Sequence, residues 1–377
     1  MKLLLRASSL VLLSLALSQP LGAQEKRKII IDQDARGPAT TDLQAILVLI
    51  QSPEVELLGI TVVSGDQWRD EEVAHTLRLL EIIGRTDIPV LPGAIFPLIN
   101  TQEEIARWEK LYGQVRYQGA WNKERMPGYE GAWNRGVYYG PFEIPPLPEG
   151  NPTTKPAQED AAHFIIRMLR QYPGEVTLYA AGPLTNLALA VSLDPEIPKL
   201  AKELVLMGGS LNPTVDARPF SPSPRREFNF WWDPEAAHIV LRAPWPRITL
   251  TPVDISIRTR LTNSLIEQIG KTDTPAAQYL AAWADEEYMW DELAAIAWLD
   301  PSIITETQTI YMDVNIDHGA GYGDTLTWPQ GANPGLGEQR VNVIVDVDRE
   351  RFYQIFRELM TRPTPTPSPA RQRSASP

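Results

Sequence analysis

Three carboxylates stand close together near the start of the chain. Asp32 and Asp34 follow the apolar run at residues 29–31, and Asp42 opens the apolar segment that comes next. Side chains alternate along a strand, so Asp32 and Asp34 would share a face, and a turn would bring Asp42 toward them. Clustered carboxylates repel unless a cation or protons neutralise them, and oxygen ligands of this type suit Ca2+ or Mg2+. The segment therefore raises the hypothesis of a metal site.

The same acids have a second explanation that needs no metal. Asp42 would then be the N-cap of the following helix, and Asp32 and Asp34 would be ordinary acids at the end of a strand. Short acidic patterns often occur without a function. The segment by itself leaves both interpretations open.

Short apolar runs alternate with amphipathic segments on both sides of this motif. The runs predict buried strands at residues 27–32, 55–65, 88–93, 175–182 and 201–209. The amphipathic segments predict helices at residues 41–53, 70–84, 161–173 and 184–195. Repeated strand–helix–strand units imply an α/β fold with a mostly parallel, Rossmann-like open central sheet and helices on both faces. Ligands of such folds bind at the carboxyl ends of the strands, where the acids stand.

Composition limits the class of protein. The 377 residues are 43% apolar, enough to bury a substantial core. The net charge of -12, with no Lys or Arg cluster in the predicted folded part, argues against a nucleic-acid polymer as partner. The absence of cysteine excludes disulfides, thiolate metal sites and cysteine nucleophiles.

The two ends of the chain differ from the rest. Residues 1–23 combine Lys2 and Arg6 with an apolar stretch and the small residue Ala23, which predicts a secretory signal peptide and a secreted or periplasmic protein. An uncleaved anchor is the alternative, and the shortness of the apolar stretch disfavours it. Residues 361–377 are rich in Pro, Ser and Thr and predict a disordered tail. The folded domain is expected at residues 25–360, with no membrane span after signal cleavage.

Two irregular segments interrupt the alternation. Residues 100–155 are dense in Trp, Tyr, Gly and Pro, and so long a connection predicts a lid or insertion. A second segment contains Asn212, Glu227 and Asn229 ahead of another helix. Both segments could contribute to a binding site.

An ordered set of motifs resembles the inosine-uridine preferring nucleoside hydrolase family. After "DQD" come "SPEVELLGITVVSGD", "GRTDIPVLPGA", "AAGPLTNLALAVSLDPEI", "ELVLMGGS", "EFNFWWDPEAAHIV" and "MWDELAAIAWLDPSII", in the order of the family. The resemblance covers about the whole mature domain. It implies one α/β domain and Ca2+-dependent hydrolysis of the N-glycosidic bond of ribonucleosides, which gives ribose and free base. Family members commonly associate as dimers or tetramers, so a homo-oligomer is also implied.

The resemblance also implies a set of metal ligands. Carried over by position, these are Asp34, Asp42, the carbonyl of Ala181 and Asp291, with Asp32 orienting the others. Asp34 and Asp291 would be the catalytic acids, with Asp34 accepting a proton from the attacking water.

A second set would hold the ribose. Glu227 and Asn229 of "EFN" would bind its hydroxyls, and Asn212 is a candidate for a further ribose contact. The alternative for "EFN" is a motif that caps a loop or helix.

Four features depart from the family pattern. Thr41 stands where the family has a ribose-binding acid, and the turn from Ala35 to Thr40 is longer than in the family. Asp66 replaces a neutral amide, and Trp290 replaces a His that protonates the leaving base in many members. Help to the leaving base would then come from a protonated Asp66 or from stacking on Trp290, Trp231 or Trp232.

The departures support an alternative function. The four His residues, His75, His163, His238 and His318, match no catalytic position of the family. A non-catalytic or altered-specificity member would bind a sugar or nucleoside in the same metal pocket without efficient cleavage.

Overall fold

The computed structural model describes residues 26–115, 117–122, 139–211 and 225–366. The predicted signal peptide, Asn212, and most of the predicted tail lie outside these residues. No helix in this described part is long and apolar enough to cross a membrane.

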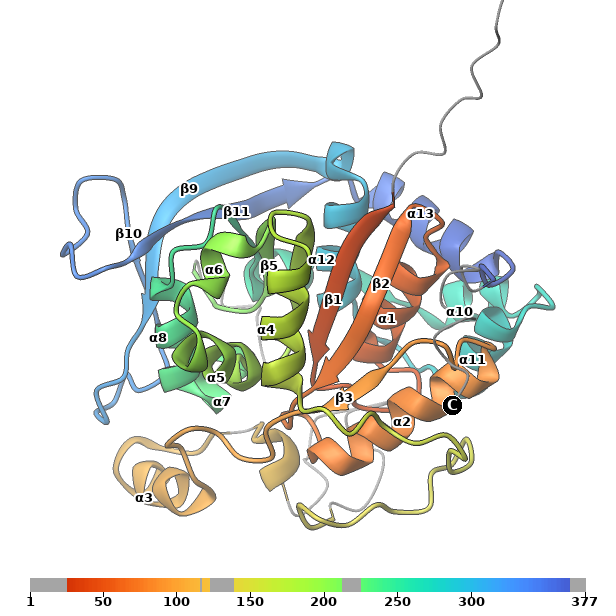
Figure 1. The fold of residues 1–377 in the computed structure, drawn as a ribbon, viewed down its shortest axis with the longest axis horizontal. Helices are drawn as coiled ribbons and strands as arrows, with labels where there is room; N and C mark the ends of the chain where they lie inside the picture. Colours follow the sequence, from red (N-terminus) through yellow and green to blue (C-terminus); the bar gives the residue numbers. More distant parts are fainter. Residues whose placement is uncertain (1–25, 116, 123–138, 212–224, 367–377) are drawn as a thin grey trace, which may run out of the picture.

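A nine-stranded sheet forms the centre of the structure (Figure 1), with the strand order β10-β9-β11-β6-β5-β4-β1-β2-β3. Its strands are β1 (Arg27–Gln33), β2 (Val55–Val62), β3 (Val90–Pro92), β4 (Val176–Ala180), β5 (Glu203–Met207), β6 (Ile248–Thr251), β9 (Ile304–Val314), β10 (Thr325–Trp328) and β11 (Gln339–Val347). Seven neighbouring strands, in the order β11-β6-β5-β4-β1-β2-β3, are parallel. β9 is antiparallel to both of its neighbours, β11 and β10. The predicted mostly parallel sheet is therefore confirmed.

Helices cover both faces of the sheet (Figure 1). One face is covered by α1 (Thr41–Gln51), α2 (Arg69–Ile82), α11 (Pro275–Trp283), α12 (Trp290–Leu299) and α13 (Arg349–Thr361). The other is covered by α4 (Ala161–Gln171), α5 (Thr185–Leu193) and α8 (Pro234–Arg242). In β1, Ile29 and Ile31 pack into the first layer and Ile30 into the second. A strand buried on both faces explains the continuous apolar run in its sequence.

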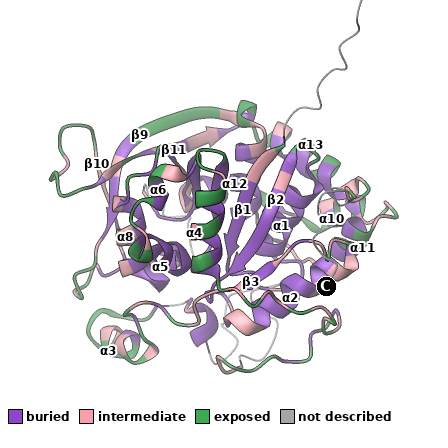
Figure 2. Ribbon diagram, in the orientation of Figure 1, coloured by how far each residue is buried: buried purple, intermediate pink, exposed green. Residues whose placement is uncertain are grey.

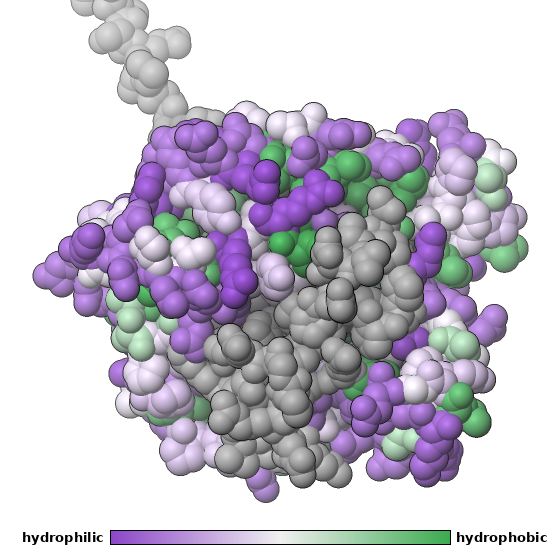
Figure 3. All heavy atoms as spheres, turned by 180° about the vertical axis from the view of Figure 1, so that it is seen from behind, coloured by the Kyte–Doolittle hydropathy of each residue, from purple (hydrophilic) through white to green (hydrophobic). Residues whose placement is uncertain are grey.

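The sheet is shielded unevenly along its length. Figure 2 shows the buried central strands and the exposed first part of β9, where residues 305–309 are all exposed. Seen from behind, the described residues present a mainly hydrophilic surface, with small apolar areas between polar ones (Figure 3). The apolar core thus lies between the helices and the central parallel strands.

The predicted lid contains a helix that the sequence analysis missed. Within residues 100–155, α3 (Gln102–Tyr112) begins at Thr101, whose side chain accepts a hydrogen bond from the Glu104 N–H. Ile105 is the one buried residue of α3, although Ile105, Trp108 and Tyr112 recur at helical spacing in the sequence. A short 3-10 helix, η1 (Gly119–Trp121), follows it, and residues 123–138 lie outside the described part.

The remaining elements are short. They are α6 (Ile197–Leu200), α7 (Phe228–Trp232), α9 (Val253–Ser256), α10 (Asn263–Ile269), η3 (Pro301–Ile303) and the two-stranded pair β7 (Arg260–Leu261) and β8 (Glu287–Tyr288). Among them α7 matters most to the site, because it carries Asn229.

Candidate active site

Asp34 lies at the carboxyl end of β1, between the ends of two neighbouring strands. A Cβ added to Gly65, after β2, would stand 2.1 Å from Asp34 Oδ2, and one added to Gly182, after β4, would stand 2.6 Å from Oδ1. The backbone N–H of Asp66 donates a 3.0 Å hydrogen bond to Asp34 Oδ2. The two glycines thus leave room for this carboxylate, and the Asp66 N–H holds it in place.

Gln33 joins two acids from distant parts of the chain. Its side-chain amide donates to Asp42 Oδ1 at 3.0 Å and to Asp291 Oδ2 at 2.7 Å. Asp42 and Asp291 also lie close enough to change each other's pKa. Asp42 comes from α1 and Asp291 from α12, the two helices that pack side by side on one face of the sheet. The fold therefore brings the carboxylates of residues 42 and 291 to the same amide group of Gln33.

The N-cap alternative for Asp42 is wrong. Thr40 occupies the N-cap of α1, and its hydroxyl donates a 2.8 Å hydrogen bond to Asp42 Oδ2. The Asp42 carboxylate accepts hydrogen bonds from the side chains of Thr40 and Gln33. Its hydrogen bonds are therefore made with side chains of the site and not with the backbone at the start of the helix.

The acids of this cluster are buried and mutually repulsive. Asp34, Asp42 and Asp291 are each no more than 3% exposed. Burial, reinforced by Asp66 and Asp42, raises the pKa of Asp34 well above its ordinary range, and burial together with Asp42 does the same to the pKa of Asp291. Burial also raises the pKa of Asp42. A dication bound among these oxygens would remove the repulsion.

The donor chemistry of the site fits a hard cation. Asp42 and Asp291 both raise the pKa of Asp34, so three carboxylates of the kind that bind Ca2+ lie near one another, and the carbonyl of Ala181 directly follows β4 beside Gly182. Among the described residues, no three His, Cys, Asp or Glu side chains already form a metal-binding group by themselves. A site here would therefore combine the carboxylates with other oxygen ligands.

Asp32 supports the neighbouring turn. Its side chain accepts hydrogen bonds from Thr61 Oγ1 at 2.5 Å and from Asn186 Nδ2 at 2.8 Å, and its carbonyl accepts one from the Ala181 N–H at 3.0 Å. Burial raises the pKa of Asp32 to about 7. Asp32 thus holds the turn that carries Ala181.

Glu227 is the N-cap of α7. Its carboxylate accepts hydrogen bonds from the backbone N–H groups of Asn229 at 2.8 Å, Phe230 at 3.1 Å and Gly209 at 2.8 Å. The alternative interpretation of "EFN", a motif that caps a helix, is therefore confirmed for Glu227. The Asn229 side chain donates to the Ala181 and Met207 carbonyls, both at 3.2 Å, which places its amide beside the predicted backbone ligand.

The Thr41 hydroxyl faces α12 and not an open space beside Asp42. It donates a 2.6 Å hydrogen bond to Glu292 Oε2 and accepts one from the Asp291 N–H at 3.1 Å. Trp290, the preceding residue, is 6% exposed, and its ring lies 4.9 Å from that of Tyr288. The first turn of α12 is thus tied to the first residue of α1.

Asp66 lies beside a basic and a phenolic side chain. The hydroxyl of Tyr117 is hydrogen-bonded to the Asp66 carboxyl, and Arg36 Nη1 lies 3.5 Å from the same hydroxyl. Burial, with a contribution from Asp42, raises the pKa of Asp66 to about 8. Asp66 and Arg36 are both buried.

Trp231 and Trp232 belong to an aromatic cluster. With Trp68, Ile105, Val115, Ala120 and Trp121 they form a third, smaller core. The Trp121 and Trp232 rings stack at 4.0 Å, and both Trp231 and Trp232 are at most 2% exposed. The two tryptophans predicted as candidates for base stacking thus serve as core residues that attach η1 and α3 to α7.

The four His residues have protein partners. His75 bonds to Glu149, His163 to Asp160 and His238 to Asp313, and the ring of His318 stacks on Tyr322 in the loop between β9 and β10.

Comparison with known proteins identifies the family. The sequence model of the inosine-uridine preferring nucleoside hydrolases matches residues 29–354. The chain belongs to this family. It is a hydrolase that acts on N-glycosyl compounds, and its family hydrolyses ribonucleosides.

Curated members of the nucleoside hydrolase family match most of the chain. A probable uridine nucleosidase 2 of Arabidopsis thaliana is 32% identical over 74% of this chain and 77% of its own length. The pyrimidine-specific ribonucleoside hydrolase RihA of Photobacterium profundum is 28% identical over 88% of this chain and 98% of its own length.

Solved nucleoside hydrolases share the fold. The plant nucleoside hydrolase PpNRh1 aligns with a TM-score of 0.68 and 27% identity over 89% of this chain and 99% of its own. A purine-preferring ribonucleoside hydrolase from Gardnerella vaginalis aligns with the same TM-score and 25% identity, over 89% of this chain and 98% of its own.

The sequence analysis missed three residues of this nucleoside hydrolase site. Gln33 lies between two acids in "DQD", and Glu292 directly follows Asp291, so proximity in sequence was an available signal for both. Tyr117 lies in the irregular segment, where nothing in the sequence marks its contact with Asp66. All three side chains are buried.

Proposed function

We propose that this chain hydrolyses the N-glycosidic bond of ribonucleosides with a Ca2+ ion held by Asp34, Asp42, the Ala181 carbonyl and Asp291. The observation that carries the proposal is the contact of Asp42 with Asp291 through Gln33, at the end of the strand that leads to Asp34. Buried acids from β1, α1 and α12 converge there. Such convergence is costly unless it serves a cation or a proton.

The residues of the site divide the chemistry among them. Bound there, Ca2+ would supply positive charge that neutralises the carboxylates and favours ionisation of a water. Asp34, fixed by Gly65 and Gly182, accepts a proton from the attacking water. Nearby carboxylates stabilise the positive charge that develops on the ribose ring.

Glu227 and Asn229 are proposed to hold the ribose hydroxyls. Three backbone N–H groups already bond to the Glu227 carboxylate, which fixes its orientation and leaves it acceptor capacity for a hydroxyl. Asn229 lies against the Ala181 carbonyl and so would place the ribose next to the metal.

A second candidate function is binding of a sugar or nucleoside in the same pocket without efficient cleavage. The observation that favours it is the orientation of Thr41, whose hydroxyl bonds to Glu292. A carboxylate at this position would strengthen a ribose contact in the transition state, and a threonine engaged elsewhere cannot.

The deciding experiment measures release of free base from uridine, cytidine, inosine and adenosine, with Ca2+ or with a chelator. Asp34→Asn and Asp291→Ala should each lower kcat/KM by roughly 100-fold or more. The exposed Asp273→Asn is the matched control and should leave the rate unchanged. Calorimetric Ca2+ binding without base release from any nucleoside would reject the hydrolytic proposal in favour of the binding function.

Secretion or export to the periplasm is also part of the proposal. It is supported by the basic, apolar and small-residue regions of residues 1–23. N-terminal sequencing of the protein recovered from the periplasm or medium should begin at Gln24. Recovery of a membrane-bound chain that retains Met1 would favour the anchor instead.

A further inference from the structure

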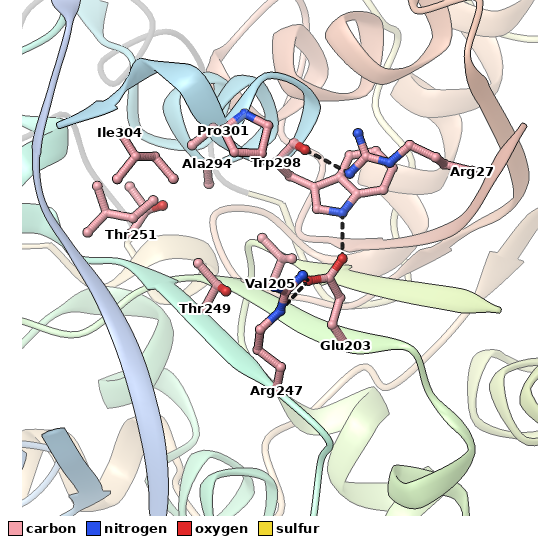
Figure 4. A pocket seen from close by; sticks show the side chains of 12 residues that line it. Arg27, Glu203, Val205, Arg247, Thr249, Thr251, Ala294, Trp298, Pro301 and Ile304 are labelled. Carbon is pink, nitrogen blue, oxygen red and sulfur yellow. Dashed lines mark hydrogen bonds and ion pairs between the residues drawn. The ribbon is translucent and has the colours of Figure 1, made fainter. Parts of the chain in front are cut away.

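A cavity of about 120 Å3 lies between α12 and the sheet (Figure 4). Apolar side chains of the sheet, of α12 and of the segment after α12 line it, namely Val205, Ala294, Ala297, Pro301, Ile304 and Ile344. Its mouth is at the beginnings of β1 and β5, where Arg27 and Glu203 stand. The cavity shares no lining residue with the proposed active site, although α12 borders both and Thr251 is the last residue of β6.

The charged groups at the mouth already satisfy one another. Arg247 pairs with Glu203 Oε2, and the Trp298 indole N–H donates a 2.9 Å hydrogen bond to Glu203 Oε1. Arg27 donates to the Trp298 and Leu299 carbonyls, at 2.8 and 3.1 Å, and lies 3.6 Å above the Trp298 ring. These pairings leave little free charge for an ionic ligand, so the occupant should be neutral.

One polar atom inside the cavity lacks a partner. The Thr251 side chain is fully buried, and its Oγ1 forms no hydrogen bond with any residue that the structure describes. Figure 4 shows Thr251 on the same side of the cavity as Thr249, two residues earlier on β6. A buried hydroxyl without a partner is costly, by an amount comparable to a lost hydrogen bond, and a ligand group that bonds to it would recover that energy.

We propose that this cavity binds a small, neutral, mainly apolar molecule whose single hydroxyl or carbonyl group bonds to Thr251. The size agrees, because an engineered apolar cavity of about 150 Å3 in another protein binds benzene. A planar or compact molecule of roughly six or seven non-hydrogen atoms meets both the volume and the polarity. Apolar surface then packs against Val205, Ala294 and Ala297.

The test is a titration of the full chain, labelled at the isoleucine δ methyl groups, with phenol and with benzene. The methyl signals of Ile304 and Ile344 should shift saturably with both probes, while that of Ile165, in the other layer, should not. Phenol should bind roughly 3- to 10-fold more tightly than benzene, as one hydrogen bond predicts. The absence of saturable shifts at Ile304 and Ile344 would overturn the proposal.

Two kinds of variant test the Thr251 hydrogen bond and the volume of the cavity separately. Thr251→Val keeps the shape and should lower phenol affinity roughly 3- to 10-fold while leaving benzene affinity unchanged. Ala294→Leu should fill the cavity and abolish the binding of both probes, and Ala297→Met provides a second filled variant should the first fail to fold. Unchanged binding in a folded filled variant, or equal affinity of the wild-type chain for phenol and benzene, would also overturn the proposal.

Discussion

The Thr41 hydroxyl donates a 2.6 Å hydrogen bond to the carboxylate of Glu292, a residue 251 positions later in the chain. Both side chains are at most 2% exposed. Because the same hydroxyl accepts the Asp291 N–H, this contact sets the position of the first turn of α12 against α1. Thr41 thus helps to position Asp291, whereas the sequence analysis placed Thr41 where the family has a ribose-binding acid.

Replacement of Thr41 tests this positioning role. Thr41→Val should lower the free energy of unfolding by about 1–3 kcal/mol, because Glu292 loses a donor and the Asp291 N–H loses an acceptor in a buried place. Thr41→Ser keeps the hydroxyl and is the matched control. Chemical denaturation gives the stability of each.

Thr41→Asp gives a sharper test of the two roles. A carboxylate here would stand against Glu292, so we expect reduced stability and reduced turnover. A rise in kcat would instead show that residue 41 reaches the ribose, as the family pattern implies.

The two hydrogen bonds by which Gln33 bridges Asp42 and Asp291 should be essential to the stability of the site. Gln33→Glu has nearly the same shape but replaces the amide donor by a third acid beside two buried acids, so it should destabilise the calcium-free protein by several kcal/mol at pH 7. Thermal unfolding with a chelator measures the effect. Gln44→Glu makes the same change in α1, beside Glu287 and outside the Asp42–Asp291 pair, and its stability is the comparison. Equal stability of Gln33→Glu and wild type would show that the bridge is not needed.

The glycine next to Asp34 should tolerate no side chain. In Gly182→Ala the new Cβ would stand 2.6 Å from Asp34 Oδ1 and 2.7 Å from its backbone nitrogen, so Asp34 must move. A displacement of this kind should lower kcat/KM by about 100-fold. Gly319→Ala, where a Cβ meets nothing within 4 Å, is the control and should retain full activity. Full activity of Gly182→Ala would contradict the proposed catalytic position of Asp34.

Glu81 should give the stability a defined pH dependence. Burial by itself would raise its pKa, but hydrogen bonds from Thr154 and Thr153 outweigh it and lower the pKa to about 2. An acid with a lowered folded-state pKa adds stability above its unfolded value of 4.5, and that stability is lost as the pH falls toward 2. Glu81→Gln should therefore be less stable than wild type at pH 7, with a difference that shrinks below pH 4.5. A difference independent of pH would refute this ionic contribution.

The sequence by itself determined the layered fold and the place of the acids. Apolar periodicity is a local property, and the alternation of Ile29, Ile30 and Ile31 already required a strand covered on both faces. The end of that strand located Asp34, and the ordered motifs indicated the family. The sequence analysis missed α3 because the segment was interpreted as one irregular insertion, although Ile105, Trp108 and Tyr112 recur at helical spacing.

Only the tertiary structure decided which partners these acids have. Hydrogen bonds are short and directional, so the roles of Gln33, Thr41 and Glu227 depended on the exact approach of segments far apart in sequence. Sequence position predicted a ribose contact for Thr41, but the packing of α1 against α12 gave its hydroxyl to Glu292. The cavity that ends at Thr251 arises in the same way, because it lies between residues of β5, β6, α12 and β11 that meet only in the folded chain.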